Sequence, residues 1–175
     1  MASFTKAQNR FRLPTLNPEF FLVSVWLGGL LAGTIYAASA STQYFLLMRM
    51  APQSHVSIVG LATAVLLPFL ITAFAVYRDR PWVLYPICFA KVFVFASCGF
   101  GITAAYGSAA WLIRFLLQFS DIFTVPLLCW FAMGHIAGRK KSWKRDIRIC
   151  LALDIVIICL DLWYISPFLA LITKN

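Results

Sequence analysis

Charged residues are scarce in this chain, and acidic residues are the scarcest of all. Asp, Glu, Lys and Arg make up 12% of the 175 residues, with 6 acidic residues against 15 Lys and Arg. Soluble domains carry about 25% charged residues, so this composition cannot cover the surface of an ordinary soluble protein. Hydrophobic residues account for 62% of the chain and aromatic residues for 16%. The lipid bilayer is therefore expected to be the main solvent of the protein.

The residues that build most catalytic and metal sites are few and badly placed. The two histidines, His55 and His135, are predicted to lie near opposite membrane faces and form no H-E-x-x-H helix or acidic cluster that would bind zinc. Ser97 has no histidine at a matching depth to activate it. The sequence also lacks a Walker lysine loop and a dinucleotide fingerprint. We therefore predict no catalytic residues, no metal and no cofactor, and a protein that is not an enzyme.

The cysteines give no sign of a disulfide or metal framework. No two of them form a C-x-x-C pair, and all fall within apolar segments, where cysteine acts as a small hydrophobic residue. The five are Cys88, Cys98, Cys129, Cys150 and Cys159.

Long apolar runs dominate what is present. A transmembrane helix needs about 20 mostly apolar residues to cross about 30 Å of hydrocarbon. The sequence predicts an all-α, polytopic membrane protein, a bundle of about five transmembrane helices. The predicted spans are residues 19–40, 56–77, 82–106, 109–136 and 147–172.

The remaining segments are short. Residues 1–18 are polar and basic and are predicted to form a cytoplasmic N-terminal segment, followed by a single transmembrane domain over 19–175. Residues 41–55 join the first two spans, with a re-entrant or sixth segment as the alternative. Pro126 is predicted to kink the fourth span.

The distribution of Lys and Arg predicts the orientation, because short loops rich in these residues stay in the cytoplasm. Eleven of them lie in the N-terminal segment, the second loop and the fourth loop with the start of the last span. The opposite side has only Arg49 and Lys174. The bias predicts a cytoplasmic N-terminus, an external C-terminus and a plasma-membrane location.

Five ionisable residues fall in the hydrocarbon region of the predicted spans, where a charge at a helix centre costs about 2.5–3.5 kcal/mol. Depth along the helices predicts that Arg114 pairs with Asp161, and that Lys91 pairs with Asp121 or Asp154. The pairs either hold three spans in register or form a proton- or solute-coupled pathway. Arg114, Gln118 and Asp121 are expected on one helical face. The complete predicted network is Lys91, Arg114, Gln118, Asp121, Asp154 and Asp161.

Small residues recur along the first span at intervals of four. Gly29, Gly33 and Ala37 leave one face without bulk, so that another helix backbone can approach closely. The partner is either a helix of the same chain, the favoured interpretation, or a helix of another protein.

The fourth loop concentrates positive charge around Trp143. It fits attraction to anionic lipid headgroups, worth about 1 kcal/mol per charge near the surface, although topology alone would also explain it. A cytoplasmic partner is the third interpretation, and nucleic acid is not expected as a partner. The residues are Arg139, Lys140, Lys141, Lys144 and Arg145.

Residues 80–135 combine a Pro-led span with a central lysine, a short Gly-containing turn and a span that contains a Val-Pro step. The corresponding residues are Pro81, Lys91, Gly107, Val125 and Pro126. This arrangement resembles the stage II sporulation protein M family. The segments FLVSVWLGGLLAGTIYAAS and DLWYISPFLALITK also resemble the family's first and last spans. In place of the family's frequent Pro-Gln/His-Asn-like element, this chain has Gln118-Phe119-Ser120-Asp121.

The resemblance implies a non-enzymatic membrane scaffold of endospore-forming bacteria, which works with septal peptidoglycan-degrading proteins during engulfment. The expected partners are the lipid bilayer and other envelope membrane proteins, or further copies of the chain. The alternative from the residues themselves is a small transporter or transport subunit that uses its intramembrane acids.

Overall fold

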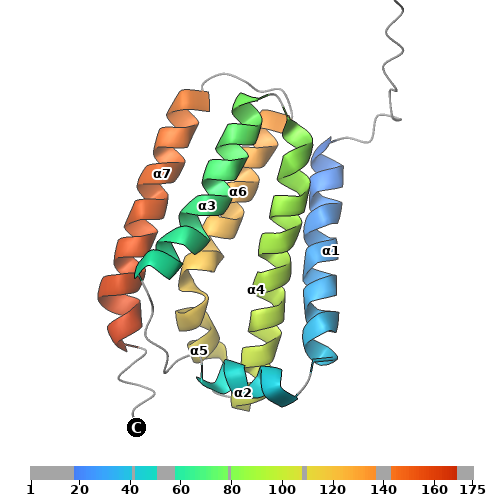
Figure 1. The fold of residues 1–175 in the computed structure, drawn as a ribbon, viewed down its shortest axis with the longest axis vertical. Helices are drawn as coiled ribbons and strands as arrows, with labels where there is room; N and C mark the ends of the chain where they lie inside the picture. The colour runs from blue at the N-terminus through green and yellow to red at the C-terminus, as the bar shows by residue number, and fades with distance from the viewer. Residues whose placement is uncertain are drawn as a thin grey trace, which may run out of the picture.

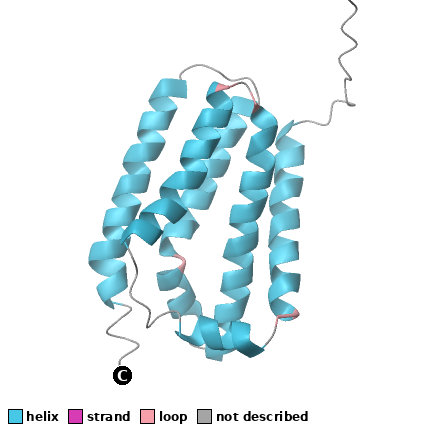
Figure 2. Ribbon diagram, in the orientation of Figure 1, coloured by secondary structure: helices cyan, strands magenta, loops and turns pink. Residues whose placement is uncertain are grey.

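The computed structural model describes residues 18–40, 42–50, 58–78, 80–107, 110–136 and 143–168. Within these ranges the chain forms helices and no strand (Figure 2). The helices are α1 (Pro18–Ala38), α2 (Thr42–Met50), α3 (Ile58–Tyr77), α4 (Leu84–Tyr106), α5 (Ala110–Leu117), α6 (Phe119–Ile136) and α7 (Trp143–Leu160). A 3₁₀ turn, η2 (Pro81–Val83), precedes α4, and a π-helical turn, η4 (Asp161–Ile165), follows α7.

Four of these helical segments are long and apolar enough to cross a membrane: α1, α3, α4 and the segment from Lys144 to Phe168. The pair α5 and α6 passes the same test together, although it is bent by 58°. Counting the pair as one span gives five, in agreement with the predicted all-α bundle.

The spans alternate in direction (Figure 1). α1, α4 and α7 run one way through the bundle, and α3 and the α5–α6 pair run the other way. One end of the bundle therefore holds the start of α1, the α3–α4 connection and the start of α7. The opposite end holds α2 and the turn at Gly107, whose φ of 57° is easily adopted by glycine.

The fourth span departs from its prediction. It breaks at Gln118 between α5 and α6, while Pro126 lies inside α6. The 58° bend of the span therefore lies two helical turns before Pro126, and the kink at that proline stays a prediction. At this break the side chains of Arg114 and Gln118 both contact Phe95 on α4.

The ends of the last span also differ from the prediction. α7 begins at Trp143, ahead of the predicted start at residue 147, and the helix continues through η4 to Phe168. Residues 169–172, the predicted end, lie outside the described part of the chain.

The segment between the first two spans contains a short helix. α2 has nine residues and lies across one end of the bundle (Figure 1). A helix of nine residues is too short to cross the hydrocarbon layer, so α2 is not a sixth span.

The apolar core lies toward the end of the bundle where α1 and α4 begin. Helices α1, α3, α4, α6 and α7 all contribute, and the rings of Phe69 and Phe131 meet edge to face at 5.2 Å. Large hydrophobic side chains such as Val59, Trp111 and Trp163 are instead exposed on the outside, as expected for a surface that faces lipid. The core residues are Leu22, Phe69, Ala73, Leu84, Cys88, Leu128, Phe131, Ala132 and Cys150.

Candidate functional site

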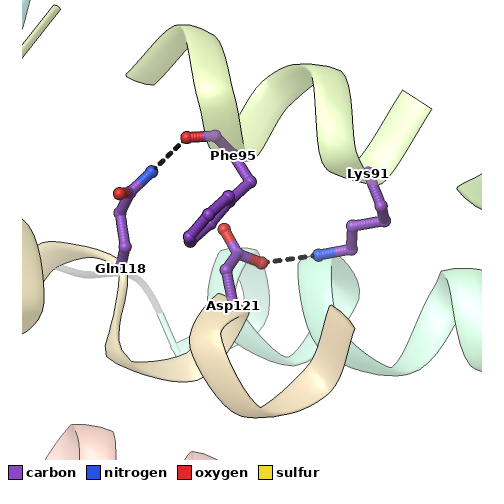
Figure 3. A network of polar contacts seen from close by, with 4 residues as sticks. All are labelled: Lys91, Phe95, Gln118 and Asp121. Atoms are coloured by element: carbon purple, nitrogen blue, oxygen red, sulfur yellow. Dashed lines mark hydrogen bonds and ion pairs between the residues drawn. The ribbon is translucent and has the colours of Figure 1, made fainter. Parts of the chain in front are cut away.

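An ion pair joins α4 to α6 inside the bundle. The Lys91 Nζ atom lies 2.8 Å from the Asp121 Oδ1 atom, and the two side chains are 15% and 26% exposed (Figure 3). Lys91 lies near the middle of its span, where an isolated ammonium group would be costly. Asp121 is one of the two acids predicted to pair with Lys91, and the structure selects it.

Gln118 makes a second tie between the same two spans. Its Nε2 atom donates a hydrogen bond of 2.6 Å to the backbone carbonyl of Phe95 on α4 (Figure 3). Its Oε1 atom accepts a hydrogen bond of 3.1 Å from the Arg114 Nε atom. Gln118 therefore links the bend between α5 and α6 to α4. Its side chain is buried.

Arg114 turns toward α4 as well. Its guanidinium carbon lies 5.7 Å from the centre of the Phe95 ring, and it covers Gly99 so closely that a Cβ atom there would lie 2.7 Å from it. Among the described residues Arg114 has no ion pair with Asp161, so that predicted pair is wrong. The 58° bend explains the error, because the depth estimate assumed one straight helix through Arg114 and Asp121.

Asp161 is buried at a different place. It opens the π-helical turn η4, and its carboxylate lies near Ser120 on α6. A π-helical turn widens a helix locally and is frequent at functional sites. The last span therefore approaches α6 at Asp161.

Asp154 is the most deeply buried of the described acids, at 2% exposure. With Lys91 and Thr124 it lines an interior cavity of about 10 Å³, measured as space for the centre of a water-sized molecule. Such a volume is close to the minimum for one water molecule. The rest of the lining is apolar and comes from Val65, Pro68, Phe69, Leu127 and Leu128.

Sequence reasoning missed Thr124 and Ser120. Thr124 lies one turn after both Ser120 and Asp121 on α6, at i+4 and i+3, and the Ser120 and Thr124 side chains are both buried. This spacing was the one available signal. It was hard to use because serine and threonine in a membrane span commonly bond to their own helix backbone.

The small-residue face of α1 packs against α4. A Cβ atom at Gly29 would lie 3.0 Å from the Phe89 carbonyl oxygen, and one at Gly33 would overlap the Phe93 carbonyl oxygen. Ala37, farther along the same face, is fully buried. The face is therefore occupied within the chain, and it does not provide a surface for a partner.

A side-chain hydrogen bond attaches helix α2 to α4. The Tyr44 hydroxyl donates to the Ser97 carbonyl oxygen at 2.7 Å. Burial raises the pKa of Tyr44 above its ordinary value of 10.0. The Ser97 hydroxyl itself donates to the Val94 carbonyl and is thus engaged by its own helix.

The basic residues near the fourth loop are described in part. Lys144 and Arg145 are exposed, and the Arg145 Nε atom lies 3.5 Å from the Asp146 Oδ1 atom. With Arg78 and Arg80 they lie at the end of the bundle where α1 begins. Arg139, Lys140 and Lys141 lie outside the described residues, as does the side chain of His135.

Within the described ranges, no three or more His, Cys, Asp or Glu side chains come together in a way that could hold a metal ion. Cys88 and Cys150 are part of the apolar core. What the interior does contain is a set of polar ties between helices and one small polar cavity. In comparisons with family models, curated proteins and solved structures, nothing matches this chain.

Proposed function

We propose that this chain is a non-enzymatic integral membrane scaffold or recruiting subunit, which presents a fixed bundle of helices to other membrane proteins. One observation carries the proposal. Within the described part of the chain, the Lys91–Asp121 ion pair and the Gln118 hydrogen bond tie α4 to the fourth span, and the cavity beside them has room for about one water molecule. Such an interior suits a rigid support and leaves no room for a solute of any size.

The resemblance to the stage II sporulation protein M family points the same way. It suggests partners in the cell envelope, among them peptidoglycan-degrading proteins at the septum, or further copies of the chain. Because Gly29 and Gly33 on α1 already face α4, we propose that partners bind to helix faces that are exposed in the isolated chain.

The test is purification of the tagged protein from its native membranes in a mild detergent. We expect another envelope protein to remain bound in fixed stoichiometry through size-exclusion chromatography. Asp154→Asn should bind the same partner equally well, because Asp154 is enclosed in the bundle. A chain that elutes alone as a monomer from native membranes would contradict the proposal.

The proposed orientation has a cytoplasmic N-terminus and an external C-terminus, in the plasma membrane. The described basic residues at the connections, Arg78, Arg80, Lys144 and Arg145, support it because they share one end of the bundle. Anionic headgroups would attract this end by about 1 kcal/mol per charge. In a background without the native cysteines, an impermeant thiol reagent should label Gly107→Cys in whole cells. It should label Lys144→Cys only after permeabilisation, and the opposite pattern would overturn the orientation.

A second candidate, a small proton-coupled transporter or transport subunit, is favoured by the buried Asp154 and the polar cavity beside it. It predicts solute uptake into proteoliposomes that depends on a proton gradient and is abolished by Asp154→Asn. Uptake that persists in this variant would exclude Asp154 as the coupling residue.

A further inference from the structure

The Thr124 hydroxyl and the Asp154 carboxylate both line the cavity between α3, α4, α6 and α7. Thr124 Oγ1 is the one buried side-chain polar atom without a hydrogen-bond partner among the described residues. Asp154, across the same cavity, has no hydrogen bond or ion pair from its carboxylate in the described part of the chain. A buried hydroxyl without a partner costs about 1–3 kcal/mol, so an occupant of the cavity is expected.

The charges around the cavity do not balance. Lys91 is paired with Asp121, and Arg114 is engaged by Gln118. Asp154 is thereby left as an acid without its own cation, and an isolated charge in an apolar interior is very costly unless it is neutralised.

We propose that Asp154 and Thr124 form a buried proton-binding site, in which Asp154 holds one proton and a single water molecule fills the cavity. The carboxylate takes a proton from a hydronium ion, becomes a neutral carboxylic acid and leaves one water molecule behind. This step conserves both atoms and charge.

The lining groups satisfy that water molecule. The Lys91 ammonium has three N–H donors and uses one of them on Asp121, so another is free for the water. The protonated Asp154 donates to the water, and the water donates to the Thr124 oxygen. Three polar partners are the usual number for a buried water.

The lining disfavours a metal cation. Of its polar side chains, just Asp154 and Thr124 supply oxygen ligands, and the third is the Lys91 ammonium, which repels a cation. The cavity's volume also suits one water-sized species.

The titratable neighbours of Asp154 are few. α3 presents only apolar side chains to the cavity, α4 presents Lys91, and α6 presents Asp121 through its pair with that lysine. On α7 itself, Cys150 lies one turn before Asp154, and Asp161 lies two turns after it, in contact with Ser120. Lys91 is therefore the one cation in these positions that can tune the site.

The test is infrared difference spectroscopy of the full-length protein in lipid nanodiscs, titrated with acid and alkali in sodium-free buffer. We expect a carbonyl-stretching band from one protonated carboxylic acid near neutral pH, which shifts in D₂O. The band should be absent in Asp154→Asn and retained in the matched control Asp161→Asn. A wild-type protein without this band, or a band that survives in Asp154→Asn, overturns the proposal.

Thr124→Val provides the second arm, because it keeps the shape of the side chain and removes the hydroxyl. The band should remain but move in frequency, and its exchange in D₂O should slow at least tenfold. A band with unchanged frequency and exchange rate would overturn the role of Thr124 and its water. If Na⁺ abolishes the band and raises the unfolding temperature where choline does neither, the occupant is a sodium ion and the proton site is wrong.

Discussion

The contact between α1 and α4 differs from the interior shared by α4, α6 and α7. In the first, small residues on one helix let its backbone touch the other, with Gly33 against the carbonyl of Phe93. In the second, helices are joined by a charge pair and by Gln118, with a small polar cavity beside them. α4 takes part in both and is the central element of the fold.

The difference shows two ways to hold helices together in lipid, where burying apolar surface against protein gains little over burying it in lipid. Close packing gains many small contacts and fails when one methyl group is added. Polar ties gain little net energy when both partners are present, but removal of one partner is costly. Each mechanism therefore has its own signature in mutants.

The largest effect is expected from Lys91→Met, which leaves Asp121 without its cation. We expect a loss of about 3 kcal/mol in the free energy of unfolding, measured by steric trapping or SDS titration. The double variant Lys91→Met with Asp121→Leu should lose less than the single one, because it removes both charges. A control, Lys144→Met at the exposed start of α7, should stay within about 0.5 kcal/mol of wild type. If the double variant is the least stable, the ion pair contributes net stability. The statement that polar ties gain little net energy would then be wrong for this pair.

Gly33→Ala is the next largest and probes the packed contact. The added Cβ would lie 2.9 Å from the Ala96 Cβ atom, so the two helices must move apart at a cost of about 2 kcal/mol. Gly28→Ala is the matched control, because its Cβ would lie 3.9 Å from the nearest atom, on the Phe89 ring. It should be neutral or slightly stabilising, since alanine favours a helix over glycine. Equal losses in both variants would show that close approach at Gly33 has no special weight.

Gln118→Leu should cost about 1 kcal/mol, the usual worth of a buried hydrogen bond, and should also change the 58° bend. The distance between spin labels on α5 and α6, measured by electron paramagnetic resonance, would report the bend. Gln43→Leu on the exposed face of α2 is the control. An unchanged distance distribution in Gln118→Leu would show that this side chain does not set the bend.

The smallest effect is expected from Tyr44→Phe, about 0.5 kcal/mol, because it removes a single hydrogen bond between α2 and α4 at the bundle end. Burial raises the pKa of Tyr44, so its contribution is fully present below pH 10.0 and is lost as the pH rises through the higher folded value. Wild type should therefore lose stability above that pH more steeply than Tyr44→Phe. Tyr164→Phe, exposed on η4, should follow the wild-type curve.

The sequence predicts the spans well because the bilayer sets a minimum length for an apolar helix. Depth along straight helices reduces the partners of Lys91 to Asp121 or Asp154, and the structure has Asp121. The pair of Arg114 with Asp161 could not be predicted, because the bend at Gln118 changes both depth and direction. The role of Thr124 could not be predicted from the sequence either. Its importance comes from having no partner, a property of the packed structure and not of the residue type.

The parallel alignment of α1 and α4 also dictates an order of assembly in the membrane. Two parallel helices cannot be joined by a tight turn. The chain therefore passes through α2 and α3 after α1 and before α4 is made. During synthesis α1 stays in lipid with its glycine stripe uncovered until α4 emerges, and no earlier helix replaces that partner. In a nascent chain halted before residue 84, the glycine face of α1 is therefore not covered by α4. Membrane proteases and chaperones would meet the chain with this helix-packing surface exposed.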